Sequence, residues 1–362
     1  MERRKFLKGA AIGTAGTALA APAIAASHAK TMTIVSTWPR DFPGLGVSAQ
    51  RLASRITELS EGAIQTEYFA AGERVGALDV FDEVASGNSQ AYIGADYYWT
   101  GKHPGLAYFT AVPFGMTFAE INAWCLYGEG RALWDELQDE FGLYGLPAGN
   151  TGTQAGGWFN KEIESADDLK GLKMRIPGLG GQVLSKLGAS TVSLPGGQIY
   201  ENLVSGSIEA TEWVGPYNDY FMKFYEAAQY YYTGGMHEPG AQLSLTSNKS
   251  WWSGLSDTER AIITAAALEE NANSYYEATA LNGEYLNRLQ EEQGVEVKSF
   301  NEDVWDAMGE AAMEVFEETA AHSEIAGRIN DSMQKAMREY GTGIALFEGQ
   351  FVENRNRIFD IG

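Results

Sequence analysis

The sequence predicts an α/β fold with two lobes, a cleft between them and one long helix that spans both. Short strand patterns alternate with helices through about residue 216, which is typical of α/β proteins. The 362 residues exceed the length over which a single core usually grows. Residues 256–293 form one uninterrupted helical pattern, roughly 55 Å long at 1.5 Å per residue. A helix of that length is expected to run along both lobes.

The first residues carry a targeting pattern. Arg3 and Arg4 precede a weakly apolar run over residues 9–21, and this pair is typical of a twin-arginine signal. Ala23-Ile24-Ala25 supplies a small-x-small cleavage pattern. The run is shorter than the roughly 20 apolar residues that a membrane span requires. We therefore expect residues 1–26 to be a signal peptide that sends the folded protein to the periplasm by the twin-arginine route.

The composition limits the partners. The chain has 26 Lys and Arg against 48 Asp and Glu, a net charge of −22. Such a surface repels nucleic acid and anionic lipid, so no nucleic-acid partner is expected. An anion site on this chain needs its own local positive charge. Cys125 is the single cysteine, which excludes a disulfide framework despite the oxidising compartment.

The strands and helices of the first lobe follow from their periodicity. Apolar residues at helical spacing, among them Leu52 and Ile56, predict a helix that ends at Gly62. Strands are predicted on both sides of that helix, and a short helix leads to the aromatic cluster Tyr97-Tyr98-Trp99. The predicted strands are residues 31–38 and 63–70, and the short helix is residues 80–85. We assign residues 27–150, with part of 240–362, to lobe I.

The second lobe repeats the alternation. The predicted strands are residues 172–176, ended by Pro177, and residues 208–214, ended by Gly215-Pro216. Helices are predicted over residues 181–187 and 197–205. We assign residues 151–239, with part of 240–362, to lobe II. A cleft between two lobes is where small ligands usually bind.

The long helix has a strong start signal. Ser256 and Glu259 form a capping box, and the pattern then continues to Gly294 without proline. No sustained heptad is present, so a coiled coil is not expected. Asn301 is predicted to cap a further helix to about residue 321. The C-terminal segment is predicted to be helical with breaks near Gly341 and Gly343.

The sequence lacks the usual catalytic patterns. His237 has no second histidine at zinc-protease spacing, and no nucleophile elbow or phosphate loop occurs. Cys125 lies among aromatic residues at helical spacing and fits a small core residue. The run from Gly178 to Gly181 resembles a dinucleotide fingerprint, but Val183 stands where its third glycine belongs. The chain is therefore predicted not to be an enzyme.

A few polar residues at strand ends and in loops are better candidates for binding. Arg175 lies in a strand whose neighbours should be buried, and a buried arginine needs an anionic partner. That partner is either a ligand carboxylate, gripped through two hydrogen bonds, or an acidic residue of the same lobe. Gln154, Glu212 and Glu238 offer oxygens that suit a hard cation. Solvated acidic side chains are the alternative for Glu212 and Glu238.

Three motifs resemble the solute-binding subunits of TRAP transporters, the DctP family. They are Asn150-Thr-Gly-Thr-Gln154, Asp168-Leu-Lys-Gly-Leu-Lys-Met-Arg175 and Thr211-Glu-Trp-Val-Gly-Pro216. The resemblance covers essentially the whole mature chain. It is greatest for the branch that binds 2-oxo acids such as pyruvate and 2-hydroxy acids such as lactate. It implies a two-lobed periplasmic solute-binding fold that closes on a small organic acid and delivers it to the TRAP membrane permease subunits.

The resemblance also implies roles for individual residues. Arg175 would pair with the substrate carboxylate, and Tyr97 and Tyr98 would cover the ligand. A metal ion that bridges to the substrate would be held by four residues: Gln154, Glu212, Glu238 and the backbone carbonyl of Trp213. The segment around Glu238 departs from the aromatic-rich pattern expected there. In some members the C-terminal helix takes part in a homodimer.

The charges favour one of the two expected metals. Glu212, Glu238 and a monocarboxylate contribute −3 and Arg175 contributes +1, which leaves −2 before the cation. Calcium neutralises that charge, whereas sodium leaves −1 in a buried site, where net charge is costly. The hypothesis therefore favours calcium over sodium.

Other functions stay open. The cargo can be another organic acid, such as a dicarboxylate or a sugar acid. A dicarboxylate calls for a second cation besides Arg175, and none lies near the motifs. The remaining alternative is a periplasmic enzyme that acts on carboxylates, with Glu212 or Glu238 as its general base.

Overall fold

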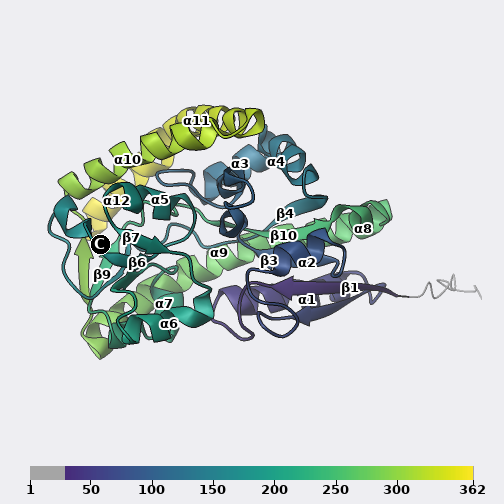
Figure 1. The fold of residues 1–362 in the computed structure, drawn as a ribbon, viewed down its shortest axis with the longest axis horizontal. Coiled ribbons are helices and arrows are strands. Elements are labelled where there is room, and N and C mark those ends of the chain that lie inside the picture. Colours follow the sequence, from purple (N-terminus) through teal and green to yellow (C-terminus); the bar gives the residue numbers. More distant parts are fainter. Residues whose placement is uncertain (1–28, 362) are drawn as a thin grey trace, which may run out of the picture.

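The structure, a computed structural model, describes residues 29–361 and contains two β-sheets surrounded by helices (Figure 1). The predicted signal peptide, residues 1–26, lies outside the described residues. The mixed α/β architecture confirms the predicted fold class. The strands β1 to β4 lie toward one end of the molecule, and β6, β7 and β9 lie toward the other.

The first sheet has five strands in the order β2-β1-β3-β10-β4. β1 pairs in parallel with β2 and β3, and β10 is antiparallel to β3 and β4. Its strands are β1 (Lys30–Ser36), β2 (Ile64–Phe69), β3 (Ala91–Gly94), β4 (Leu143–Asn150) and β10 (Gln242–Asn248). β10 arrives from late in the chain, so this sheet is completed only after the second sheet is nearly finished.

The second sheet has six strands in the order β11-β9-β5-β8-β6-β7. β5 is antiparallel to β8 and β9, and the other neighbours are parallel. Its strands are β5 (Gly157–Phe159), β6 (Lys173–Arg175), β7 (Ser190–Val192), β8 (Ala210–Thr211), β9 (Tyr230–Thr233) and β11 (Glu296–Ser299). The chain therefore passes from the first sheet to the second between β4 and β5, returns between β9 and β10, and passes to the second again between β10 and β11.

Most of the helices are short and connect strands. These are α1 (Leu45–Leu59), α2 (Val80–Ala85), α3 (Phe118–Tyr127), α4 (Gly130–Asp139), α5 (Gly178–Lys186), α6 (Gly196–Val204), α7 (Pro216–Met222) and α8 (Lys249–Ser253). The longer C-terminal helices are α9 (Asp257–Gln293), α10 (Glu302–Ala320) and α11 (Glu324–Ile344), with α12 (Gln350–Phe359) at the end. Short 3-10 helices are η1 (Asp96–Trp99), η2 (Pro104–Phe109), η3 (Ala166–Leu169) and η4 (Phe224–Glu226), and a π turn, η5 (Ala345–Gly349), joins α11 to α12.

The helix α9 packs against β4 and α1 of the first sheet's layer and against α7 of the second (Figure 1). It begins with the predicted capping box, because the Ser256 side chain accepts from the Glu259 amide at 3.2 Å and the Glu259 side chain accepts in return. It ends at Gly294, whose φ of 66° stops the helix. On the first lobe's side, Arg51 of α1 donates to both Glu270 and Glu277 of α9.

Two sequence-based boundaries are wrong. The strand predicted to reach residue 214 ends at Thr211, because the amides of Val214 and Gly215 donate to the Asp219 carboxylate instead of to a neighbouring strand. The breaks predicted near Gly341 and Gly343 do not occur, since α11 runs through both glycines. A glycine inside a helix costs about 1 kcal/mol relative to alanine, which weakens a helix without ending it.

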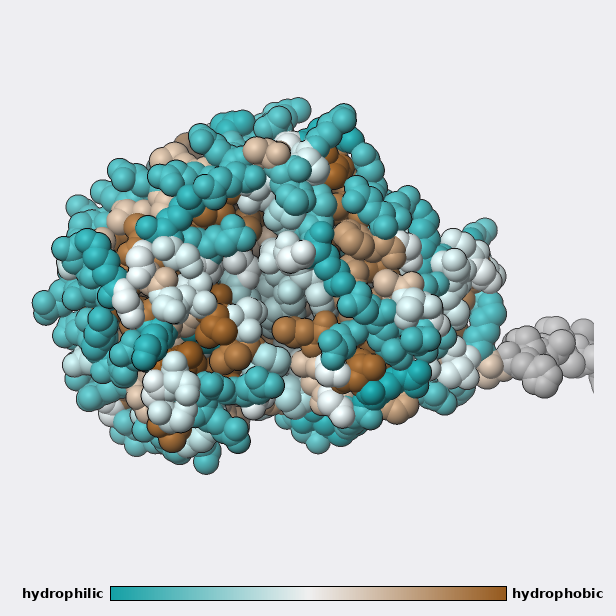
Figure 2. Space-filling view, viewed as in Figure 1, coloured by the Kyte–Doolittle hydropathy of each residue, from teal (hydrophilic) through white to brown (hydrophobic). Residues whose placement is uncertain are grey.

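The core is aromatic and the surface is polar. In the first lobe, Phe109 stacks between Trp124 and Trp134, with both ring centroids 5.4 Å away. The visible face of the molecule is mostly hydrophilic, with apolar residues in separate patches (Figure 2). Within residues 29–361, none of the helices combines the length and the apolar character needed to cross a membrane.

Candidate functional site

Arg175 is the last residue of β6 and is enclosed by its neighbours. Its side chain is 1% exposed, its Nε donates to the carbonyl of Leu194 at 3.1 Å, and its Nη1 donates to the Glu212 carboxylate. The ion pair within the lobe, which the sequence left open, is therefore present. Its Nη2 is buried without a partner among the described residues. A desolvated guanidinium nitrogen without a partner is available to an anion.

Glu212 and Trp213 follow β8 and lie beside this arginine. The Glu212 amide donates to the Arg175 carbonyl at 3.3 Å, which fixes the start of the turn. The Glu212 Oε2 is buried and has no hydrogen-bond donor within residues 29–361. The Trp213 ring lies 5.4 Å from the Arg175 guanidinium carbon and packs edge-on against Phe42 of the first lobe. Trp213 thus contacts both lobes.

Gln154 and Glu238 lie on the two segments that connect the sheets. The Gln154 Nε2 donates to the Glu238 carboxylate at 2.6 Å and to Thr151 Oγ1 at 3.1 Å. The backbones of the segments are also joined, because the Gln154 amide donates to the Glu238 carbonyl at 3.0 Å and the Gly235 amide donates to the Gln154 carbonyl at 2.9 Å. The Gln154 Oε1 is buried and unpaired in the part of the chain that the structure describes.

The acidic side chains of the site interact strongly. Glu212, His237 and Glu238 each offer an atom that lies within 4.8 Å of the others. Burial, and then repulsion by Glu212, raises the pKa of Glu238 well above its usual range, while Arg175 opposes the rise. Two buried carboxylates this close repel each other unless a proton or a cation lies between them. A proton on Glu238 or a bound cation would relieve this repulsion.

Tyr97 and Tyr98 approach this cluster from the first lobe, on η1. Their rings meet edge-to-face with centroids 4.8 Å apart. Burial raises the pKa of Tyr97 well above its usual range, and the charge of Glu238 adds to the rise. Both tyrosines line a groove of about 510 Å³ that is also lined by Ile176 and Pro177. The other predicted site residues are buried and do not line this groove: Gln154, Arg175, Glu212, Trp213 and Glu238. The charges of Arg175, Glu212 and Glu238 act on both tyrosines, so the structure brings the predicted residues together between the lobes.

The donor set fits a hard cation. The Gln154 Oε1 and Glu212 Oε2 are buried oxygens with no hydrogen-bond donor among residues 29–361, and the Glu238 carboxylate is adjacent. No donor to the Trp213 carbonyl is found among the described residues either. Carboxylate, amide and backbone oxygens are the ligands that calcium takes. The fit rests on these unpaired oxygens.

His237 is a member of the site that sequence reasoning missed. Its ring is 3% exposed, and its Nε2 lies 3.4 Å from the Glu212 Oε2. In the sequence, His237 stands out only as a possible half of a zinc-protease pair. Its position directly before Glu238 was the available signal, because a residue next to a buried site residue is often buried beside it.

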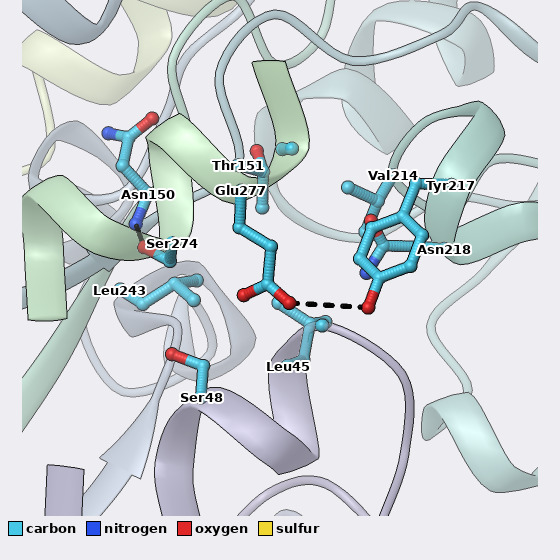
Figure 3. Close-up of a pocket in the computed structure, with 12 residues that line it drawn as sticks. Leu45, Ser48, Asn150, Thr151, Val214, Tyr217, Asn218, Leu243, Ser274 and Glu277 are labelled. Atoms are coloured by element: carbon cyan, nitrogen blue, oxygen red, sulfur yellow. Dashed lines mark hydrogen bonds between the residues drawn. The ribbon is translucent and has the colours of Figure 1, made fainter. Parts of the chain in front are cut away.

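A second cavity lies where α1, α7 and α9 meet, and it is too small for an organic acid. Its volume of about 20 Å³ has room for one water molecule. Figure 3 shows Glu277 reaching across it to the Tyr217 hydroxyl, which donates at 3.3 Å. Arg51 donates to the same carboxylate at 2.9 Å. This contact joins a helix of each lobe to α9 and belongs to the connection between the lobes.

Comparison with known proteins agrees with this arrangement. Residues 35–323 match the family described as bacterial extracellular solute-binding protein, family 7, or DctP. The chain is 40% identical over 332 residues to a monocarboxylate 2-oxoacid-binding periplasmic protein of Nostoc sp., covering 89% of this chain and 90% of that protein.

Two solved structures are similar over nearly their whole length. A TRAP periplasmic solute-binding protein from Pseudoalteromonas atlantica, with bound sodium and pyruvate, is 37% identical with a TM-score of 0.86; the match covers 90% of this chain and 98% of that one. A TRAP solute-binding protein from Bordetella bronchiseptica is 30% identical with a TM-score of 0.89, and covers 91% and 98%. It is a mixed-occupancy dimer with copurified calcium and picolinate.

These relatives are binding proteins, and the two-lobed fold is common to them. The family match spans most of the chain and includes every residue of the site described above. The chain therefore belongs to the DctP family of bacterial extracellular solute-binding proteins and is a solute receptor of the TRAP type rather than an enzyme.

Proposed function

We propose that this receptor binds a small 2-oxo or 2-hydroxy monocarboxylate, such as pyruvate or lactate, together with a calcium or sodium ion. The observation that carries the proposal is the unpaired Arg175 Nη2 beside buried oxygens of Gln154 and Glu212. The arginine would take the carboxylate of the acid. The relatives named above support the ligand class, because one binds 2-oxo acids and another holds sodium and pyruvate.

Four residues would hold the cation through oxygen: Gln154, Glu212, Glu238 and the Trp213 carbonyl. The cation would offset the charge of the two carboxylates and add a positive contact for the acid. Calcium would neutralise the net charge of −2 that Glu212, Glu238, Arg175 and a monocarboxylate leave together, whereas sodium would leave −1 in the buried site. Tyr97 and Tyr98 would cover the ligand from the first lobe and exclude water.

A monocarboxylate is favoured over a dicarboxylate by the surrounding charges. Lys186 is a second cationic side chain that lines the groove next to Tyr97 and Tyr98. Its Nζ is already 2.8 Å from Glu318 and 3.1 Å from Glu314. A second ligand carboxylate would have to displace these acidic partners.

We also propose the division into lobes and the closure between them. Lobe I would contain residues 27–150 and lobe II residues 151–239, each with part of 240–362, and residues 256–293 would span both. The strand order supports this division, because the chain changes sheets between β4 and β5 and between β9 and β10. Asn218 of α7 donates to the Pro43 carbonyl of the first lobe at 3.0 Å, and this contact would form on closure. Small-angle scattering that shows no compaction on ligand addition would count against closure.

We propose that the receptor works in the periplasm and arrives there by the twin-arginine route. Arg3 and Arg4 support the route, and a cargo folded before export is compatible with it. Export of a reporter fused to residues 1–26 should stop when both arginines are replaced by lysine.

The proposal also includes delivery of the acid to TRAP membrane permease subunits, which the family supports. Unchanged uptake by cells that lack the receptor would contradict this delivery role.

Calorimetry of residues 27–362 tests the ligand and the cation. Pyruvate, 2-oxobutyrate, lactate and succinate are titrated in three buffers: with calcium, with sodium, and with EDTA in the absence of sodium. We expect the monocarboxylates to bind in the calcium buffer and to lose affinity in EDTA. Tighter binding of succinate, or turnover of any of these acids, would contradict the proposal. Affinity that survives EDTA and disappears without sodium would replace calcium by sodium.

Arg175 variants test the site itself. Arg175→Ala removes the carboxylate partner and should weaken binding by roughly 100-fold or more. Because it also leaves Glu212 buried without its partner, Arg175→Lys is measured beside it. Lysine keeps the charge but loses the planar pair of donors, so it should also weaken binding. Arg328→Ala, which breaks an exposed pair with Glu136, is the control and should bind as the wild type does. Wild-type affinity in both Arg175 variants would disprove the assignment.

A further inference from the structure

Asp219 is a buried carboxylate close to the proposed cation ligands. It lies on α7, is 0% exposed, and accepts four hydrogen bonds. Its Oδ1 accepts the amides of Val214 and Gly215, each at 3.1 Å. Its Oδ2 accepts Trp158 Nε1 at 3.0 Å and Tyr231 Oη at 3.1 Å. One oxygen thus holds the backbone after Trp213, and the other anchors the carboxylate to β5 and β9.

We propose that Asp219 is a positioning residue that aims the Trp213 carbonyl at the cation. This inference rests on the proposed function, in which that carbonyl is a ligand. The Trp213 carbonyl and the Val214 amide belong to the same peptide group. No peptide bond is cis within the described residues, so the C=O and N–H point to opposite sides. A carboxylate that holds the N–H on one side therefore fixes the direction of the C=O on the other.

The neighbouring peptide group is held at both ends. The Gly215 amide donates to the Asp219 Oδ1, and the Val214 carbonyl accepts from the Ala155 amide at 2.9 Å. Ala155 directly follows Gln154, another proposed ligand. The turn therefore has little freedom to rotate the Trp213 carbonyl away. That carbonyl itself has no hydrogen-bond donor among residues 29–361.

Burial raises the pKa of Asp219 to about 7, although the hydrogen bonds from Trp158, Val214 and Tyr231 oppose the rise, so the carboxylate becomes ionised as the pH rises through that value. In its ionised form Asp219 has a second effect on the same carbonyl. A hydrogen bond to an ionised acceptor is stronger than one to a neutral acceptor and polarises the donor group. An amide whose N–H is bound by a carboxylate carries more negative charge on its oxygen. Such an oxygen is a better ligand for a hard cation. Partners of metal ligands commonly change metal affinity 10- to 100-fold when they are replaced.

Calcium titration of four proteins tests the inference: the wild type, Asp219→Ala, Tyr231→Phe and Glu238→Gln. Asp219→Ala should weaken calcium binding roughly 10- to 100-fold. Tyr231→Phe removes one donor to the Oδ2 but keeps both bonds to the Oδ1, so its affinity should stay within about threefold of the wild type. Glu238→Gln removes a proposed ligand and should weaken binding directly.

Hydrogen exchange of the cation-free protein is the second measurement. The peptide that contains Val214 and Gly215 should exchange faster in Asp219→Ala than in Tyr231→Phe, because only the first change removes the acceptor of both amides. If Asp219 served core stability alone, exchange would rise to the same extent in both variants. Should Asp219→Ala fail to fold, Asp219→Ser replaces it, since serine fills more of the site and its hydroxyl can pair with one of the freed donors.

The outcomes separate the two proposals. A wild type that binds neither calcium nor sodium would overturn the proposed cation site and this inference with it. A wild type that binds calcium, beside an Asp219→Ala variant with the same affinity, would overturn the inference alone. Equal losses in Asp219→Ala and Tyr231→Phe would also overturn it, because the effect would then be structural.

Discussion

Two buried aspartates lie on either side of the cleft, Asp219, which accepts backbone amides in the second lobe, and Asp96, which accepts from side chains in the first. Asp96 directly precedes Tyr97 and Tyr98. Its carboxylate accepts from Ser244 Oγ at 2.6 Å, Trp134 Nε1 at 2.9 Å and Gln138 Nε2 at 3.2 Å. Burial raises its pKa to about 6, although these three donors and the charge of Arg131 work in the opposite direction. The folded protein thus favours a protonated Asp96 more than the unfolded chain does.

The pKa shift of Asp96 predicts how stability depends on pH. The folded value of about 6 exceeds the unfolded value of 3.8, so the stabilising contribution is full below about pH 4 and is lost as the pH rises to 6. The shift corresponds to about 3 kcal/mol in the free energy of unfolding. Asp96→Asn cannot titrate, so its stability relative to the wild type should rise by that order between pH 4 and pH 7.

Urea unfolding at several pH values measures this difference. Asp306→Asn, an exposed change on α10, is the control and should follow the wild type at every pH. A difference between Asp96→Asn and the wild type that stays constant across the range would contradict the assigned shift.

The residues of the site were predictable to different degrees. Arg175, Gln154 and Glu212 were predicted because they lie in short motifs, and Glu238 was predicted although its segment departs from the expected pattern; the structure brings the four together. The pairing of Arg175 with Glu212 depends on two strand ends lying side by side, which periodicity does not reveal. Asp219 gave no signal, since a carboxylate that caps amides four and five residues earlier looks like any acidic residue on a helix.

At the scale of elements, α9 shows how the same residue type has opposite effects at two places. Gly283 is exposed in the middle of the helix, and a Cβ added there would meet no atom within 4 Å. Gly294 ends the helix with a φ of 66°, and a Cβ there would also meet no atom within 4 Å. Space is therefore equal at the two positions, and backbone conformation alone distinguishes them.

Alanine at each glycine tests this reasoning. Gly283→Ala should stabilise the protein by about 0.5–1 kcal/mol, because alanine loses less freedom on entering a helix. Gly294→Ala should destabilise it by about 1–2 kcal/mol, because the left-handed conformation strains any residue with a Cβ. Urea unfolding measures both. If both substitutions changed the free energy of unfolding in the same direction, the helical conformation at Gly283 or the left-handed conformation at Gly294 would be contradicted.

The sequence predicted the bounds of a helix best where particular residues mark both its beginning and its end. The capping box and Gly294 gave the bounds of α9 to the residue, and α2 was also predicted with its observed bounds. The predicted strand over residues 208–214 was too long because a side chain, Asp219, took the amides that a strand would have used. The joining of β10 to the first sheet could not be predicted, since it depends on contacts between distant parts of the chain.

At the scale of the whole molecule, the C-terminal end is the part with the most exposed apolar surface. The exposed side chains include Leu346 (62%), Phe347 (78%), Phe351 (65%) and Phe359 (71%), and α12 has no buried residue. Exposed apolar groups of this size on a helix favour association. Leu346 and Phe347 lie in η5, and Phe351 and Phe359 lie in α12. We propose that η5 and α12, together the C-terminal helix, contribute to a homodimer, and the dimeric relative from Bordetella bronchiseptica supports the proposal.

Charged substitutions on this helix test the dimer. Phe347→Asp combined with Phe351→Asp should give a monomer in sedimentation equilibrium, because two charges would be buried at the interface. Tyr276→Asp, at a 61% exposed position on α9, is the control and should leave the dimer intact. A wild type that sediments as a monomer, or a double variant that remains dimeric, would exclude this role for the helix.

The connecting segments between the sheets have a consequence for the order of events during capture. Gln154 and Glu238 lie on these segments and are hydrogen-bonded to each other, while Glu212 and Trp213 lie next to them on the second lobe. An opening motion that swings the first lobe away carries off Tyr97 and Tyr98 but leaves those four residues in place. The proposed cation would therefore load into the open receptor before the acid arrives. In stopped-flow experiments that mix the cation-free receptor with acid and cation together, acid binding should show a lag while the cation binds, and its rate should saturate as the cation concentration rises. A receptor that is preloaded with the cation should bind the acid without this lag.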